Sequence, residues 1–152
     1  MNWGSQISTV IGVALGIGAT LLADRVRYRR EQATRSKDAL RDLYVRYLKT
    51  LNESSSSLRL IILKETDPAV RYRAALDAFR ESSVLEHRYE INLLAPRAVK
   101  EKSDQAYRLL RNFRDLLECE PDLTLSSPEY IQALDRFHNA RKALQETMRE
   151  NL

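Results

Sequence analysis

The first 23 residues most constrain what this chain can fold into. No Asp, Glu, Lys or Arg precedes Asp24, and residues 3–23 form an uncharged run dominated by Ile, Val, Leu, Ala and Gly. As a helix, a run of this length spans about 30 Å, the thickness of the hydrocarbon core of a bilayer. The sequence therefore predicts a transmembrane anchor over residues 1–23.

Two other interpretations of this run remain. One is a buried helix of a soluble protein, since Ser, Thr and Gln dilute the hydrophobicity and glycine disfavours a helix in water. The other is a cleaved signal peptide, but no Lys or Arg precedes the apolar run. Because membrane helices tolerate glycine and hydroxyl residues, an uncleaved anchor is favoured.

The flanks of the run predict its orientation. Four arginines follow it within seven residues, whereas only the terminal amine is positive on the other side. By the positive-inside rule, the N-terminus lies outside and the C-terminal part is cytoplasmic, as in a single-pass protein of the cell membrane. The residues expected at the bilayer interface are Trp3, Arg25, Arg27, Tyr28, Arg29 and Arg30.

All four glycines of the chain lie within the first eighteen residues. Small residues recur there at every fourth position and include one GxxxG motif; they are Gly4, Ser8, Gly12, Gly16 and Thr20. On a helix this ladder forms a shallow groove that lets a second helix backbone approach closely. It predicts a homo-oligomer, although small residues are also common in membrane helices that do not pair.

The net charge of +4 comes entirely from the segment after the anchor. Residues 24–37 hold six basic and two acidic side chains, and residues 38–152 hold nineteen of each sign. We interpret residues 24–38 as a basic juxtamembrane stalk that is attracted to anionic lipid headgroups. No nucleic-acid partner is expected, because binding nucleic acid needs a basic face on the folded part.

Residues 39–152 read as helical throughout. Apolar residues recur there at intervals of three and four, and no glycine follows Gly18. Thr66 and Asp67 before Pro68 are a helix-start signal, and Ser126 and Glu129 have the spacing of a capping box. The "SSSS" of residues 54–57 is expected to bend or end the first helix. The predicted core positions are Leu40, Leu43, Tyr44, Tyr47, Leu51, Leu58, Ile61, Ile62, Tyr72, Ala75, Leu76, Phe79, Val84, His87, Ile91, Leu94, Val99, Ala106, Leu109, Leu110, Phe113, Leu116, Leu117, Ile131, Leu134, Phe137, Ala140, Leu144 and Met148.

Residues 84–94 are ambiguous between a helix and an edge strand, because apolar and polar residues alternate there. A helix is favoured, since no second strand-like segment exists to pair with a strand. The expected fold is therefore all-α: an N-terminal transmembrane helix that continues through the polar stalk into an antiparallel bundle of three to four helices.

Residues that could form a catalytic, phosphate-binding or metal-binding site are scarce in this sequence. A phosphate-cradling loop needs glycines, and residues 19–152 contain none. The candidate metal ligands Glu86, His87, Glu90, Asp135 and His138 lack the carboxylate number and Glu-x-x-His spacing of bundle metal sites. The single Cys119 can form no intramolecular disulfide. We predict no catalytic residue, cofactor or metal, and no enzyme activity.

Residues 11–30, "IGVALGIGATLLADRVRYRR", and residues 91–99, "INLLAPRAV", carry a family resemblance. The chain resembles uncharacterised small single-pass membrane proteins of actinobacterial type. The resemblance implies a membrane-anchored cytoplasmic helical domain and supplies no functional residue.

Two functions are consistent with these patterns. The first is a non-enzymatic interaction or scaffold protein that self-associates in the bilayer and presents its cytoplasmic bundle to an unidentified protein partner. The alternative is a membrane-active effector, or an accessory subunit of a membrane complex, whose clustered anchors perturb the bilayer.

Overall fold

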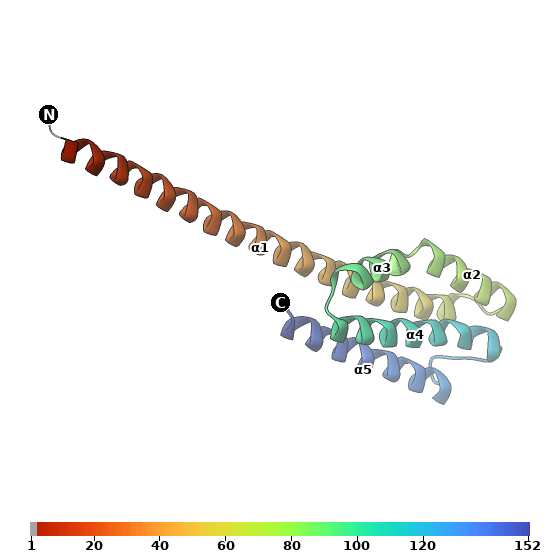
Figure 1. Ribbon diagram of the computed structural model, residues 1–152. Coiled ribbons are helices and arrows are strands. Elements are labelled where there is room, and N and C mark those ends of the chain that lie inside the picture. Colours follow the sequence, from red (N-terminus) through yellow and green to blue (C-terminus); the bar gives the residue numbers. More distant parts are fainter. Residues whose placement is uncertain (1–2) are drawn as a thin grey trace. The chain divides into compact units, whose positions relative to one another are not determined.

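The computed structural model describes the backbone of residues 3–152 and the side chains of residues 27, 28, 32 and 34–152. It is all-helical, and no strand occurs in the described backbone. The helices are α1 (Trp3–Lys64), α2 (Pro68–Glu81), α3 (Val84–Leu94), α4 (Arg97–Cys119) and α5 (Pro128–Glu150) (Figure 1). The chain divides into two compact units, Met1–Ala39 and Leu40–Leu152.

The predicted anchor, residues 1–23, lies outside the part whose side chains are described. The same holds for the whole ladder of Gly4, Ser8, Gly12, Gly16 and Thr20, and for Trp3, Arg25, Arg29 and Arg30 of the predicted interface. Arg27 and Tyr28 are described, and both side chains are exposed. Where side chains are described, no helix offers a stretch long and apolar enough to cross a bilayer. The anchor therefore stays a prediction.

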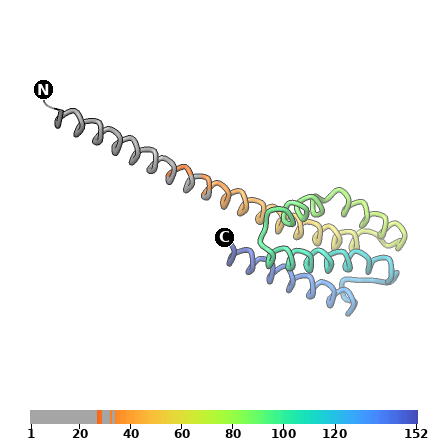
Figure 2. The backbone as a smooth tube through the Cα atoms, viewed as in Figure 1, coloured from red at the N-terminus to blue at the C-terminus, as the bar shows by residue number. Residues whose placement is uncertain are grey.

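The second unit is a helical bundle, as the sequence predicts. The chain passes along it four times, with the last part of α1, then α2 and α3 in succession, then α4, then α5 (Figure 2). The sequence predicts three to four helices in the bundle, whereas five helices contribute to it, because residues 68–94 fold as two helices that share one pass. Residues 84–94 are a helix and not an edge strand.

A side-chain cap marks the start of α2, whereas no described side chain caps the start of α5. Asp67 caps α2, since its Oδ1 accepts hydrogen bonds from the backbone N–H of Ala69 at 2.8 Å and of Val70 at 3.1 Å. The capping box predicted at Ser126 and Glu129 was wrong, because the N-cap of α5 is Ser127. The Ser127 hydroxyl turns backward and accepts a hydrogen bond from the Thr124 N–H at 2.9 Å, which stabilises the preceding turn.

The core runs along one face of each pass, and most predicted positions are buried or half-buried in it. Leu94 and Ile131 are exceptions, since both are exposed. Leu94 is the last residue of α3, and Ile131 lies in the first turn of α5. Helical periodicity predicts a buried face but does not predict where neighbouring helices stop covering it.

One polar pair lies within this core and joins α1 to α4. The hydroxyl of Ser103 donates a hydrogen bond to the Tyr47 hydroxyl at 3.0 Å, and Tyr47 donates in turn to the Ser103 carbonyl at 3.4 Å. Both residues are fully buried. Burial raises the pKa of Tyr47 to about 12, so its hydroxyl stays protonated and able to donate.

Arg71 clamps together the two connections at one end of the bundle. Its side chain is buried, and its Nε donates to the carbonyl of Glu65 at 3.1 Å, in the turn between α1 and α2. Its Nη1 donates to the carbonyls of Pro121 at 3.2 Å and Leu123 at 3.1 Å, in the connection between α4 and α5. One guanidinium thus satisfies three carbonyls of segments that have no helical partners.

We expect Arg71→Met to lower the free energy of unfolding by about 2 kcal/mol, because the three carbonyls lose charge-assisted hydrogen bonds. Urea denaturation of the intact chain, followed by near-UV circular dichroism of tyrosine, measures this change. Arg73→Met, at an exposed position of α2, is the matched control and should change stability by less than about 0.5 kcal/mol. Equal stabilities for the two variants would show that Arg71 is not a clamp.

Candidate functional site

The junction between α2 and α3 is the main break within the bundle's second pass. Ser82 ends α2 in an extended conformation, with φ −72° and ψ 137°. Its hydroxyl donates to the carbonyl of Phe79 at 2.7 Å. Ser83 then occupies the N-cap position of α3, and no described side chain caps that helix. The two serines divide the pass because their hydroxyls compete with backbone hydrogen bonding.

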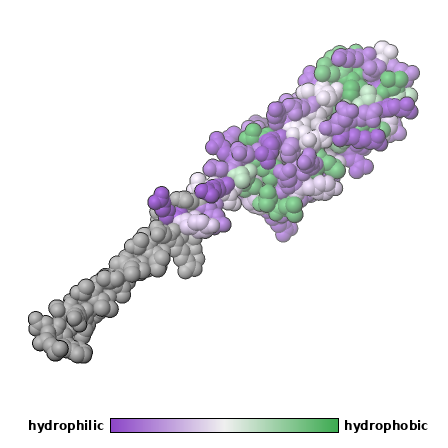
Figure 3. Space-filling model, turned by 90° about the horizontal axis from the view of Figure 1, so that it is seen from above, coloured by the Kyte–Doolittle hydropathy of each residue, from purple (hydrophilic) through white to green (hydrophobic). Residues whose placement is uncertain are grey.

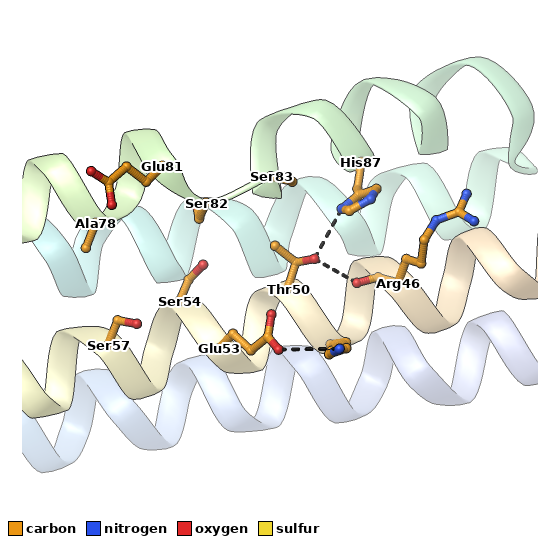
Figure 4. A pocket seen from close by; sticks show the side chains of 11 residues that line it. Arg46, Thr50, Glu53, Ser54, Ser57, Ala78, Glu81, Ser82, Ser83 and His87 are labelled. Atoms are coloured by element: carbon orange, nitrogen blue, oxygen red, sulfur yellow. Dashed lines mark hydrogen bonds and ion pairs between the residues drawn. The ribbon is translucent and has the colours of Figure 1, made fainter.

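An open groove of about 530 Å³ lies between this junction and α1. Figure 4 shows its walls: α1 forms the lower side, and the end of α2 with the start of α3 forms the upper side. Five of its eleven lining residues carry a hydroxyl group. The lining residues are Arg46, Lys49, Thr50, Glu53, Ser54, Ser57, Ala78, Glu81, Ser82, Ser83 and His87.

Ser54 is the unusual member of this lining. Its side chain is only 5% exposed, and its hydroxyl has no hydrogen-bond partner among the described residues. In Figure 4 it rises from α1 toward Ser82 at the junction. A buried hydroxyl without a partner costs about 1–3 kcal/mol, so this atom stands out from the many satisfied groups around it.

The charged residues of the groove form only loose ion pairs. Lys49 Nζ lies 3.7 Å from Glu53 Oε1, and Arg46 Nη2 lies 3.6 Å from Glu90 Oε2. All four side chains are exposed, and pairs of this kind are worth about 0–1 kcal/mol. The groove lining thus carries two cations, Arg46 and Lys49, and two carboxylates, Glu53 and Glu81.

His87 and Thr50 join α3 to α1 at the inner end of the groove. The Thr50 hydroxyl donates its single hydrogen to the carbonyl of Arg46 at 2.8 Å, and the His87 Nδ1 lies 3.1 Å from Thr50 Oγ1. Because that hydrogen is already used, His87 donates through Nδ1–H. His87 thus lies at the contact between α3 and α1 with its Nδ1 hydrogen-bonded to Thr50.

The candidate metal ligands do not come together. No group of three or more His, Cys, Asp or Glu side chains that could hold a metal ion occurs among the described residues. His138, on α5, packs against the Phe137 ring at a centroid distance of 5.9 Å. Glu90 pairs with Arg46, and Glu86 is exposed.

A second candidate surface is the outer face of α3, formed by Leu85, Tyr89 and Leu93. These residues recur at intervals of four, so they form one stripe on the helix. All three are exposed, and Leu93 is 79% exposed. Figure 3 shows separate apolar patches on an otherwise polar bundle surface. A stripe of large apolar side chains on one helix is typical of a protein-binding surface.

Ser54, Ser82 and Ser83 were not predicted as site residues. For Ser54 the signal in the sequence is the serine run of residues 54–57, which predicted only a bend or an end of the helix. Leu85, Tyr89 and Leu93 lie within residues 84–94, where the alternation of apolar and polar residues did not single out this stripe.

His138 gives the bundle a testable pH dependence. Burial lowers the pKa of His138 below its ordinary value of 6.5, helped by Arg141 and Arg59 and opposed by Asp135. The unfolded chain therefore takes up this proton more readily, so the stabilising contribution is complete above about pH 6.5 and is lost as the pH falls through the folded pKa. We expect His138→Gln to lose less stability than the unsubstituted chain between about pH 7.5 and about pH 5.5.

Urea denaturation at the two pH values measures this difference. Asn139→Gln changes a neighbouring exposed residue without removing a titratable group, so it should keep the original pH dependence. If His138→Gln and the unsubstituted chain lost the same stability between the two pH values, titration of His138 would not contribute to the pH dependence.

The chain matches no model of a known protein family, no curated protein and no solved structure in the comparisons made with it. Three features of its own residues therefore bear on function: the uncharged run of residues 3–23, the serine-lined groove and the outer face of α3.

Proposed function

We propose that this protein is a membrane-anchored, non-enzymatic interaction protein that self-associates through its anchor and presents its bundle to a protein partner. The observation that carries the proposal is the uncharged run of residues 3–23, followed directly by the basic residues that hold the whole net charge. A run of this length suits a bilayer span, and the arginines after it suit a cytoplasmic bundle.

The small-residue ladder supports pairing of the anchors. Gly12 and Gly16 are its GxxxG pair, and Gly18 is the one glycine that lies off the ladder. Two positions along a helix correspond to about 200° of rotation, so Gly18 lies on nearly the opposite face from Gly16. Close backbone approach through the ladder supplies the dispersion contacts that lipid tails do not match.

The outer face of α3 supports recruitment of a partner. Tyr89 is 59% exposed at its centre, with Leu85 one turn before it and Leu93 one turn after it. Three large side chains on one stripe match the helix-in-groove mode, in which an apolar helix face enters a groove of the partner. Aromatic residues such as Tyr89 are enriched among the residues that dominate binding energy.

We expect Gly12→Ile combined with Gly16→Ile to weaken self-association by about tenfold, because two branched side chains hold the helix backbones apart. Single-molecule counting of the labelled chain in lipid bilayers measures the oligomer fraction. Gly18→Ile is the matched control and should leave this fraction unchanged. Assembly that survives the double substitution would exclude the ladder as the pairing surface.

We expect Leu85→Gln combined with Leu93→Gln to lower photo-crosslinking to a partner in native membranes by about tenfold, since a binding hot spot is worth at least 1–2 kcal/mol. Leu60→Gln combined with Leu63→Gln is the matched control, because it also replaces two exposed leucines of the bundle. Equal loss of crosslinking in both variants would mean that replacing any two exposed leucines has this effect. The outer face of α3 would then not be the binding surface.

The alternative function is a membrane-active effector, or an accessory subunit of a membrane complex. The glycine ladder also favours it, because clustered anchors with small residues can perturb a bilayer. Release of an entrapped dye from vesicles that contain the intact chain separates the two functions. If the chain is an interaction protein, the vesicles retain the dye. If it is a membrane-active effector, dye is released in proportion to the oligomer fraction.

A further inference from the structure

We propose that the groove beside the α2–α3 junction binds a phosphate monoester through the N-terminus of α3, the Ser54 hydroxyl and the side chain of Lys49. This site goes beyond the proposed interaction function, and it does not depend on whether the anchor pairs. Three features of the groove support an anion of this chemistry.

The first feature is the N-terminus of α3. This helix has eleven residues, and its first turn closes with a hydrogen bond from the His87 N–H to the Ser83 carbonyl at 3.0 Å. No described side chain caps it, although Ser83 occupies the N-cap position. Uncapped N–H groups and the positive end of the helix dipole together favour an anion there.

The second feature is the unpartnered Ser54 hydroxyl, which is independent of the first. It comes from another helix and lies under the same junction (Figure 4). The ordinary solution for a serine within a helix is a hydrogen bond to the carbonyl four residues earlier. Thr50 adopts this solution one turn away, toward Arg46, whereas Ser54 does not. A phosphate oxygen supplies the acceptor that the Ser54 hydroxyl lacks.

The third feature is charge. Lys49 and Arg46 line the groove, and each is paired only loosely with a carboxylate. Glu53 and Glu81 also line it and oppose an anion. Glu53 is the ion-pair partner of Lys49, and the Glu81 carboxylate points away from the junction in Figure 4. Removal of the Glu81 charge is expected to strengthen anion binding, whereas removal of the Ser54 hydroxyl or the Lys49 charge is expected to weaken it.

The test is isothermal titration of the intact chain in detergent micelles with inorganic phosphate and with glycerol 3-phosphate. We expect Ser54→Ala to weaken binding about fivefold and Lys49→Gln about threefold, whereas Glu81→Gln tightens it. Ser56→Ala is the matched control, since Ser56 is an exposed serine of the same cluster and does not line the groove. Vesicles that contain phosphatidic acid form a further arm, which distinguishes a lipid headgroup from a free phosphate ester.

Each outcome decides the proposal. Binding of either source that weakens in Ser54→Ala and not in Ser56→Ala supports it, together with shifts of the Val84 and Leu85 amide resonances on addition of phosphate. Absence of saturable binding, or binding that Ser54→Ala leaves unchanged, overturns it. Ser54→Ala removes a buried unpaired hydroxyl and should fold normally, and Glu81→Gln gives an independent readout if it does not.

Discussion

The bundle depends on the burial of one face of α1. Its buried apolar residues include Leu43, Tyr47, Leu51 and Leu58, spaced four or seven apart, and the other passes pack around them. Each such side chain contributes about 1.5–3 kcal/mol when it leaves water. α3 has eleven residues and depends on packing against its neighbours, because isolated helices of fewer than about twelve residues are marginal in water.

The same stripe also explains the groove. Between Leu51 and Leu58 the inward positions are the small residues Ser54 and Ser55. The break at Ser82 and Ser83 lies over this turn of α1 (Figure 4). A helix junction presents few large side chains to its neighbour, so the two serine clusters leave space where two continuous helices would interdigitate. The groove is therefore a consequence of where the second pass is interrupted, and its polar lining follows from the residues that cause the interruption.

The sequence allows prediction of features that depend on local chemistry. Periodicity predicts the buried stripe of α1, and Asp67 before Pro68 predicts the start of α2, because each signal lies within a few turns of its effect. Tertiary features escape this reasoning. Nothing local to Ser54 indicates that it lies beneath Ser82, and nothing near Arg71 indicates that its carbonyl partners include Leu123. The "SSSS" segment was expected to bend or end a helix, yet α1 continues to Lys64 because neighbouring passes hold it.

α3 is the element that links the two candidate surfaces. Its N-terminus faces the groove, its outer face is apolar, and its inner side is fixed to α4 by Arg88, whose Nε and Nη2 lie 2.9 and 2.8 Å from Asp104 Oδ1. The Arg88 guanidinium also stacks 4.5 Å from the centre of the Tyr107 ring. The proposed anion at the N-terminus and the proposed partner on the outer face would therefore both act on this one short helix. If the anion stabilises the α3 conformation that the partner binds, the partner strengthens anion binding by the same factor, because coupling between two binding sites is reciprocal.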